Sequence, residues 1–60
     1  MTVYRLTIHD DAGRRVDDSD EEFNEVQLEA FLATCDKRLI GRDTFYVRDG
    51  AILQYVSENV

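Results

Sequence analysis

Residues 44–56, TFYVRDGAILQYV, contain the clearest structural signal in the chain. The Asp-Gly pair at positions 49 and 50 separates two runs rich in β-branched and aromatic residues, a pattern typical of a β-hairpin with a two-residue turn. That turn pairs Val47 with Ile52 and Tyr46 with Leu53. We expect one face of the hairpin to pack against a helix and the other to be partly exposed. The first face would consist of Phe45, Val47, Ile52 and Val56, and the second of Tyr46, Leu53 and Tyr55.

The residues before the hairpin have the pattern of a helix with a well-defined start. Asn24 is the predicted N-cap, and Gln27, three positions later, completes a capping box. Phe23 and Leu28 have the arrangement of a hydrophobic staple, which packs the incoming chain onto the first helical turns. The helix is therefore predicted to begin at Glu25.

The predicted end of this helix is Arg38. Lys37 and Arg38 would then lie in the last turn, where cations complement the helix macrodipole, and Gly41 would follow as the stop signal. Apolar residues at helical spacing predict a buried stripe. Its members are Leu28, Phe31, Leu32, Cys35 and Leu39. Because it is the single cysteine, Cys35 cannot form an intramolecular disulfide, and we expect it to pack as a small hydrophobe.

The N-terminal residues 2–9 alternate in a way that predicts a half-buried strand. Tyr4, Leu6 and Ile8 would share one face, and Arg5, Thr7 and His9 the other. DDAG at 10–13 is typical of a turn, and RRVDD at 14–18 can return as a short strand. The sequence thus predicts an α+β fold in the order β(β)αββ, with one helix across an antiparallel sheet of three to four strands. Residues 1–60 would form a single small acidic domain.

Charge narrows the range of partners. Thirteen acidic residues against seven Lys and Arg give a net charge of −6. This balance argues against nucleic acid and anionic membrane surfaces as ligands, because both require a basic surface. Basic proteins or cations are the expected partners of such an acidic surface. No signal-peptide pattern and no apolar run of membrane-spanning length occurs in the sequence, so we expect a cytoplasmic protein.

Residues 17–25, DDSDEEFNE, concentrate the acidic charge. Six of these nine residues are carboxylates, and no Lys or Arg occurs between Arg15 and Lys37. One or two acids would complement the helix macrodipole, whereas six repel one another, so a functional use is indicated. On the predicted helix, further acids continue the acidic loop as a ridge. The predicted partner-binding residues are Asp17, Asp18, Asp20, Glu21, Glu22, Glu25, Glu29 and Asp36.

A weakly apolar stripe of Val26, Ala30 and Ala33 lies beside this predicted ridge. It would either pack under the N-terminal loop or dock a partner together with the ridge. In the second case the carboxylates would steer the encounter, and the small side chains would allow close approach.

Catalytic and metal chemistry have little support in the sequence. His9 and Asp10 resemble an acid–base dyad, but neighbours along a strand point to opposite faces and no nucleophile accompanies them. Asp18, Asp20, Glu22 and Glu29 match part of the EF-hand spacing, yet Phe23 occupies the position where the loop needs Gly. We therefore expect no enzyme activity, no cofactor and no specific metal site.

A ridge of carboxylates on a small scaffold can imitate a nucleic-acid backbone and occupy a groove lined by Lys and Arg. In length, acidity, the helix NEVQLEAFLATC and the hairpin TFYVRDGAILQYV, the whole chain resembles the small phage-type anti-CRISPR proteins, in particular inhibitors of the type I-C system of Pseudomonas. No diagnostic motif carries this resemblance. It implies a monomeric, non-enzymatic inhibitor in the host bacterial cytoplasm. Such an inhibitor would bind the basic nucleic-acid-binding surface of a Cas protein complex and block target DNA.

Two other functions remain open at this point. The chain could be a small antitoxin-like or regulatory module that neutralises a basic partner such as a toxin or nuclease. It could also be an acidic domain that works within a larger assembly. Both use the same acidic residues, so the sequence alone does not separate them from an inhibitor of a CRISPR complex.

Overall fold

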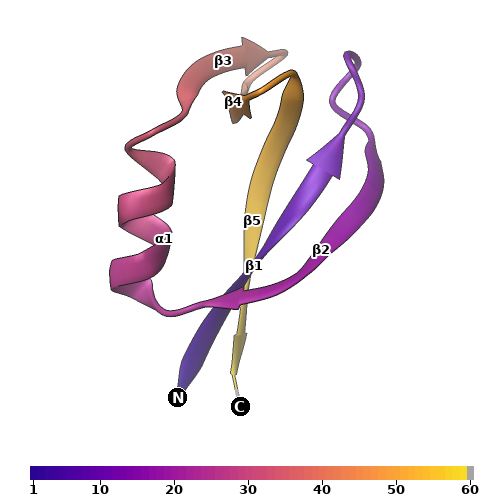
Figure 1. Ribbon diagram of the computed structural model, residues 1–60. Coiled ribbons are helices and arrows are strands. Elements are labelled where there is room, and N and C mark those ends of the chain that lie inside the picture. Colours follow the sequence, from indigo (N-terminus) through magenta and orange to yellow (C-terminus); the bar gives the residue numbers. More distant parts are fainter. Residues whose placement is uncertain (60) are drawn as a thin grey trace.

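A computed structural model describes residues 1–59 as five strands and one helix (Figure 1). The elements are β1 (Thr2–His9), β2 (Arg15–Phe23), α1 (Glu25–Leu32), β3 (Asp36–Ile40), β4 (Asp43–Arg48) and β5 (Ala51–Asn59). The predicted α+β class with one helix is confirmed. The antiparallel sheet has five strands, however, rather than three to four, because a strand follows the helix where the sequence suggested more helix.

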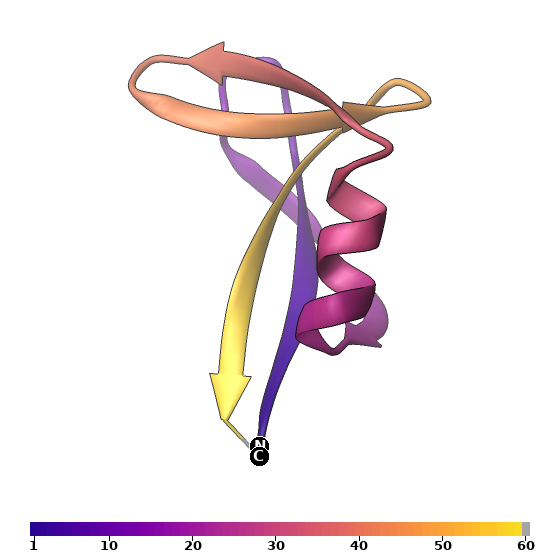
Figure 2. The same ribbon diagram turned by 90° about the vertical axis from the view of Figure 1, so that its left-hand side faces the viewer.

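The sheet has the strand order β2-β1-β5-β4-β3, and the long strand β5 connects its two halves. Residues 52–59 of β5 pair with β1, whereas only Ala51, Ile52 and Leu53 pair with β4. Figure 2 shows the consequence: the β3–β4 hairpin runs across one end of β1 and β5 instead of extending alongside them. The sheet is therefore strongly curled, and its two halves face different directions.

The Asp-Gly hairpin turn has the predicted register. Tyr46 lies opposite Leu53 and Val47 opposite Ile52. Asp49 and Gly50 have φ angles of 51° and 81°. Positive φ at both central residues is the requirement of the type I′ turn, whose twist matches that of the flanking strands.

The helix also begins as predicted. The Asn24 side chain accepts a hydrogen bond from the Gln27 backbone N–H (2.8 Å), and the Gln27 side chain accepts one from the Asn24 backbone N–H (2.9 Å). These two bonds satisfy donors that a helix N-terminus leaves without partners. Phe23 and Leu28, the predicted staple, are both buried in one core cluster.

The predicted end of the helix is wrong. α1 ends at Leu32, and the chain turns through residues 33–35 before β3 begins at Asp36. Shorter-range bonds replace the helical ladder there: the Thr34 backbone N–H donates to the Phe31 carbonyl (3.0 Å), and so does the Thr34 hydroxyl (2.6 Å). A hydroxyl that bonds the nearby backbone competes with helix continuation. Lys37 and Arg38 consequently lie in β3, and Gly41 lies in the turn between β3 and β4.

The main core lies between α1 and one face of the sheet. Leu6, Phe23, Leu28 and Leu53 are buried together there. Around them pack the half-buried side chains of Tyr4, Ile8, Phe31, Leu32, Tyr46 and Ala51. The predicted inward face of β1 is confirmed, and Leu28, Phe31 and Leu32 of the predicted helical stripe contribute to this core. Leu39 does not, because it lies on β3 and is 73% exposed.

The predicted orientation of the β4–β5 hairpin is wrong. Leu53 and Tyr46 pack in the helix-side core. Phe45 and Ile52, predicted to face the helix, lie on the opposite face, where they are nevertheless buried, with exposed fractions of 3% and 6%. Val47 and Val56 share that opposite face with them, since alternate residues of a strand point the same way. Both faces of this hairpin are rich in apolar residues, so alternation alone could not decide which face meets the helix.

Curling of the sheet buries the face that has no helix. The His9 ring makes an edge-on contact with the Phe45 ring, with 5.0 Å between ring centroids. His9 also hydrogen-bonds the Thr7 hydroxyl (2.7 Å) and the Gly13 carbonyl (3.1 Å) through its two ring nitrogens. Thr7 itself is 2% exposed. His9 is therefore a half-buried structural residue that ties the β1–β2 turn to the buried side chains of this face, Phe45 and Ile52, which we call the second cluster.

Candidate functional site: an acidic edge strand

The acidic stretch is a strand, not the predicted loop. β2 pairs with β1 on one side only, and it forms one edge of the sheet. Charged side chains on an edge strand disfavour pairing with a strand of another molecule. We call the carboxylates of this strand the acidic edge, and all of them are exposed: Asp17, Asp18, Asp20, Glu21 and Glu22. The suggested return strand at 14–18 is thus present, and it continues to Phe23.

An irregularity in the pairing shapes the acidic edge. Glu22 lies opposite Arg5 and Asp18 opposite Thr7, so residues 19–21 of β2 face the single residue Leu6 of β1. Extra residues on one strand bend it and re-aim its side chains. The Ser19 hydroxyl accepts a hydrogen bond from the Glu21 backbone N–H (3.1 Å), and the Ser19 carbonyl accepts one from Arg5 (3.4 Å). These contacts hold the bulged segment against β1.

Two arginines neutralise part of the acidic edge. Arg5 lies between Glu22 (3.5 Å) and Glu58 (3.0 Å), so that one guanidinium links β2, β1 and β5. The hydrogen bond and negative charge of Glu58, together with the charges of Glu22 and Asp20, raise the pKa of Arg5 above its ordinary value. Arg15 forms the other pair, with 2.6 Å between its Nε and the Asp18 carboxylate.

The remaining acids of this region form no ion pair within residues 1–59. They are Asp17 and its neighbours Asp20 and Glu21 on β2, followed by Glu25 and Glu29 on α1. Glu25 and Glu29 are exposed and four residues apart, so they lie on the same side of the helix. These five carboxylates keep their charges available to a partner.

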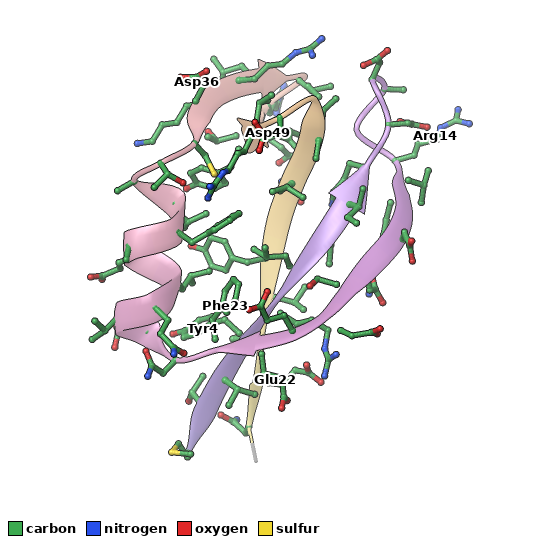
Figure 3. The ribbon with its side chains drawn as sticks, in the orientation of Figure 1. Tyr4, Arg14, Glu22, Phe23, Asp36 and Asp49 are labelled. Atoms are coloured by element: carbon green, nitrogen blue, oxygen red, sulfur yellow. The ribbon has the colours of Figure 1, made fainter. Side chains whose placement is uncertain are left out.

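Asp36 is not part of this surface. The predicted ridge placed it on the helix beside Glu29, but it is the first residue of β3, at the opposite edge of the sheet from β2. Figure 3 shows Asp36 near one end of the molecule and Glu22 toward the other. The structure therefore keeps seven of the predicted eight residues on β2 and α1, which are consecutive elements, and separates the eighth from them.

The weakly apolar stripe beside the helix acids is open. Val26 is 74% exposed, and Ala30 and Ala33 are exposed as well. No segment within residues 1–59 covers them, so the alternative in which they pack under the N-terminal loop is wrong. Docking of a partner on this stripe stays a prediction.

The acids that matched part of the EF-hand spacing lie in a different geometry from a calcium loop. Asp18, Asp20 and Glu22 lie within an extended strand, whereas an EF-hand loop wraps around its ion. Within residues 1–59, no group of three or more His, Cys, Asp or Glu side chains is arranged to hold a metal ion.

Sequence reasoning missed two features near the candidate site. The first is β3, which carries Lys37 and Arg38 on the edge opposite the acidic one. Gly41 followed by Arg42 was the available signal, because a two-residue loop beginning with Gly is a hairpin pattern. The second is a surface hollow where β2 meets α1, for which the sequence holds no signal because it depends on the angle between the two elements.

Comparisons with known proteins leave this surface to be interpreted on its own geometry. No family model, no curated protein and no solved structure matches the chain. Within the described residues, α1 is too short to cross a membrane, and no other helix is present there.

Proposed function

We propose that the protein is a non-enzymatic inhibitor of a CRISPR surveillance complex of the type I-C class. It would bind as a monomer in the bacterial cytoplasm and prevent target DNA from entering the complex. The observation that carries this proposal is the acidic edge, an extended row of exposed carboxylates on an edge strand, continued by Glu25 and Glu29 on the next element.

The geometry of an extended strand suits imitation of a phosphate backbone. A strand advances about 3.4 Å per residue. The phosphates of one B-DNA strand follow each other at about 3.4 Å along the helix axis. Five of the six residues from 17 to 22 are acidic, so the strand as a whole carries nearly one charge per residue, divided between its two faces. A Lys- and Arg-lined channel that holds DNA would meet a similar series of charges here.

Incomplete internal pairing supports a role in binding. Arg5 and Arg15 engage Glu22 and Asp18, while the other acids of β2 form no ion pair within residues 1–59. A basic partner would relieve the electrostatic repulsion among these acids. The unpaired carboxylates would be stabilised most by its positive charge.

A charge-reversal experiment with a matched control tests the proposal. The test variant combines Asp17→Lys, Asp20→Lys and Glu21→Lys, which leaves both internal arginine pairs intact. The control combines Asp11→Lys, Asp36→Lys and Asp43→Lys, three exposed acids away from the acidic edge with the same change in net charge. The measurement is competition with target DNA for a purified type I-C complex.

We expect the test variant to inhibit DNA binding about tenfold less than the wild type, or weaker still, because charge contacts across the interface are reversed. The control should inhibit like the wild type. Equal loss in both variants would leave only net charge as the cause, and full activity of the test variant would refute the acidic edge as the binding surface. If the wild type ignores the complex but neutralises a basic toxin or nuclease, the antitoxin-like alternative holds instead.

A further inference from the structure

The hollow between β2 and α1 joins an apolar floor to the acidic edge. It is lined by Leu6, Glu21, Glu22, Phe23, Gln27 and Phe31. The rings of Phe23 and Phe31 lie with their centroids 5.7 Å apart and their planes inclined by 42°. Figure 3 shows Phe23 between β2 and α1, beside Tyr4. A ligand group in this hollow would therefore meet aromatic and aliphatic carbon below and polar groups at the rim.

Only one of the two acids at the hollow has a carboxylate available to a ligand there. Phe23 lies opposite Tyr4 and packs toward the helix, and Glu21, which belongs to the bulged segment, also lines the hollow. Glu22 is directed to the other face, where it pairs with Arg5. Glu21 forms no ion pair within residues 1–59, and it sits in the bulged segment that Ser19 holds in place.

This combination of groups selects a class of ligand. An aromatic floor with a carboxylate at its rim suits a planar cation on an apolar stem, which stacks on the ring and donates hydrogen bonds to the carboxylate. Arginine fits this description better than lysine, because the guanidinium is planar and more weakly hydrated than an ammonium group. The protein already uses the same contact internally: the Arg48 guanidinium lies 5.2 Å from the centroid of the Phe31 ring.

We infer that the hollow receives an arginine side chain of the partner. The inference rests on the proposed function only in taking the partner to be a basic protein. It adds a specific anchor to a surface that otherwise offers charge alone. The acidic edge would steer the partner over distances comparable to the Debye length, and the hollow would fix the register once the surfaces meet.

Titration of the intact protein with small ligands tests this site without any partner. The probes are Nα-acetyl-arginine amide, the corresponding lysine amide, and the corresponding citrulline amide, which keeps the shape of arginine without its charge. Chemical shifts of the Leu6 methyl groups and the two phenylalanine rings report on the hollow. We expect saturable shifts with the arginine probe, weaker ones with lysine, and none with citrulline.

Two matched variants identify the carboxylate. Glu21→Gln should weaken binding of the arginine probe about fivefold, the upper range for an exposed ion pair. Asp43→Asn removes an exposed acid that lies outside the hollow, the acidic edge and α1, and it should leave binding unchanged. Equal binding of citrulline, equal affinities of the two variants, or no saturable shift up to the solubility limit would each overturn the inference.

Failure of this site and failure of the proposed function are distinguishable. If the hollow does not bind arginine but charge reversal on the acidic edge still abolishes competition with DNA, the inhibitor proposal stands without this anchor. If the hollow binds arginine but the protein does not compete with DNA for the complex, the site stands and the partner is a different basic protein.

Discussion

The two faces of the curled sheet are buried by different means. On one face, α1 supplies Leu28, Phe31 and Leu32 to a core that includes Leu6 and Leu53. On the other face no helix is present within residues 1–59, yet Phe45 and Ile52 are as inaccessible as the residues beneath the helix. The β1–β2 turn approaches the β3–β4 hairpin there (Figure 2), and its Gly13 lies against the Phe45 ring and the Ile40 side chain.

This difference shows how a chain of sixty residues obtains two buried clusters from one helix. A small domain can bury only about 60% of the surface of its unfolded chain, so a flat sheet with one bare apolar face would be costly. Curling allows the sheet to cover itself. The helix-side core then depends on large side chains from distant elements, whereas the second cluster depends on close approach of backbone to an aromatic ring.

The largest expected effect tests whether the second cluster is a true core. Phe45→Ala should lower the free energy of unfolding by about 3–5 kcal/mol, as for other buried aromatic residues. Had Phe45 been on an open face, the loss would be under about 1 kcal/mol. Urea denaturation followed by circular dichroism measures the change, with Leu28→Ala as the helix-side comparison.

A total stability of only about 3–5 kcal/mol is typical of chains this short, so Phe45→Ala could unfold the protein outright. Phe45→Leu then provides a milder measurement at the same position. Val56→Ala, on the same face but 38% exposed, is the control. If the Phe45 variants lost no more free energy of unfolding than the Val56 variant, the second cluster would contribute little to stability. The comparison between the two faces would then fail.

A smaller effect tests how the β1–β2 turn closes over Phe45. Gly13 has a φ angle of 83°, and a Cβ added there would lie 3.2 Å from the Phe45 ring and 3.3 Å from the Ile40 side chain. Gly13→Ala should therefore cost about 1–3 kcal/mol, since it combines backbone strain with crowding. The measurement is the same urea denaturation.

Gly50→Ala separates the two causes. Gly50 has nearly the same φ, 81°, but an added Cβ there has no atom within 4 Å. Its replacement should therefore cost the strain alone. The excess cost of Gly13→Ala over Gly50→Ala measures the contact between the turn and the second cluster. Equal costs would mean that the turn does not press on Phe45.

The comparison of faces also explains which parts of the fold could be predicted from the sequence. Local signals were reliable: Asp49 and Gly50 set the hairpin register, and Asn24 with Gln27 set the helix start. Both depend on residues within a few positions of one another. The orientation of the hairpin was not encoded locally, because apolar residues occupy both of its faces, and only the curl of the whole sheet decides which face meets α1.

The candidate site was predictable in a similar, partial way. The acidic residues are evident from composition, and most of them do fall on consecutive elements. Their conformation was not predictable, because the sequence of β2 has few β-formers and the strand exists through its pairing with β1. Asp36 and the hollow depend on where the helix ends and on how β2 meets it, and these are tertiary features.

The smallest expected effect tests where the helix ends, and so how far the helix-side face extends. A helix to Arg38 would bury Leu39 in the same stripe as Leu32. In the structure Leu32 packs in the helix-side core, whereas Leu39 lies opposite Thr44 on the edge strand β3 and is 73% exposed. Leu39→Ala should therefore change the free energy of unfolding by less than about 0.5 kcal/mol. Leu32→Ala should cost about 2–5 kcal/mol, toward the lower end because Leu32 is only half-buried.

Thermal and urea denaturation of the two variants, side by side, measure the difference. Similar losses would place Leu39 on the buried side of a longer helix. That result would remove β3 from the sheet and, with it, the β3–β4 hairpin to which Phe45 belongs, so the smallest effect bears directly on the largest.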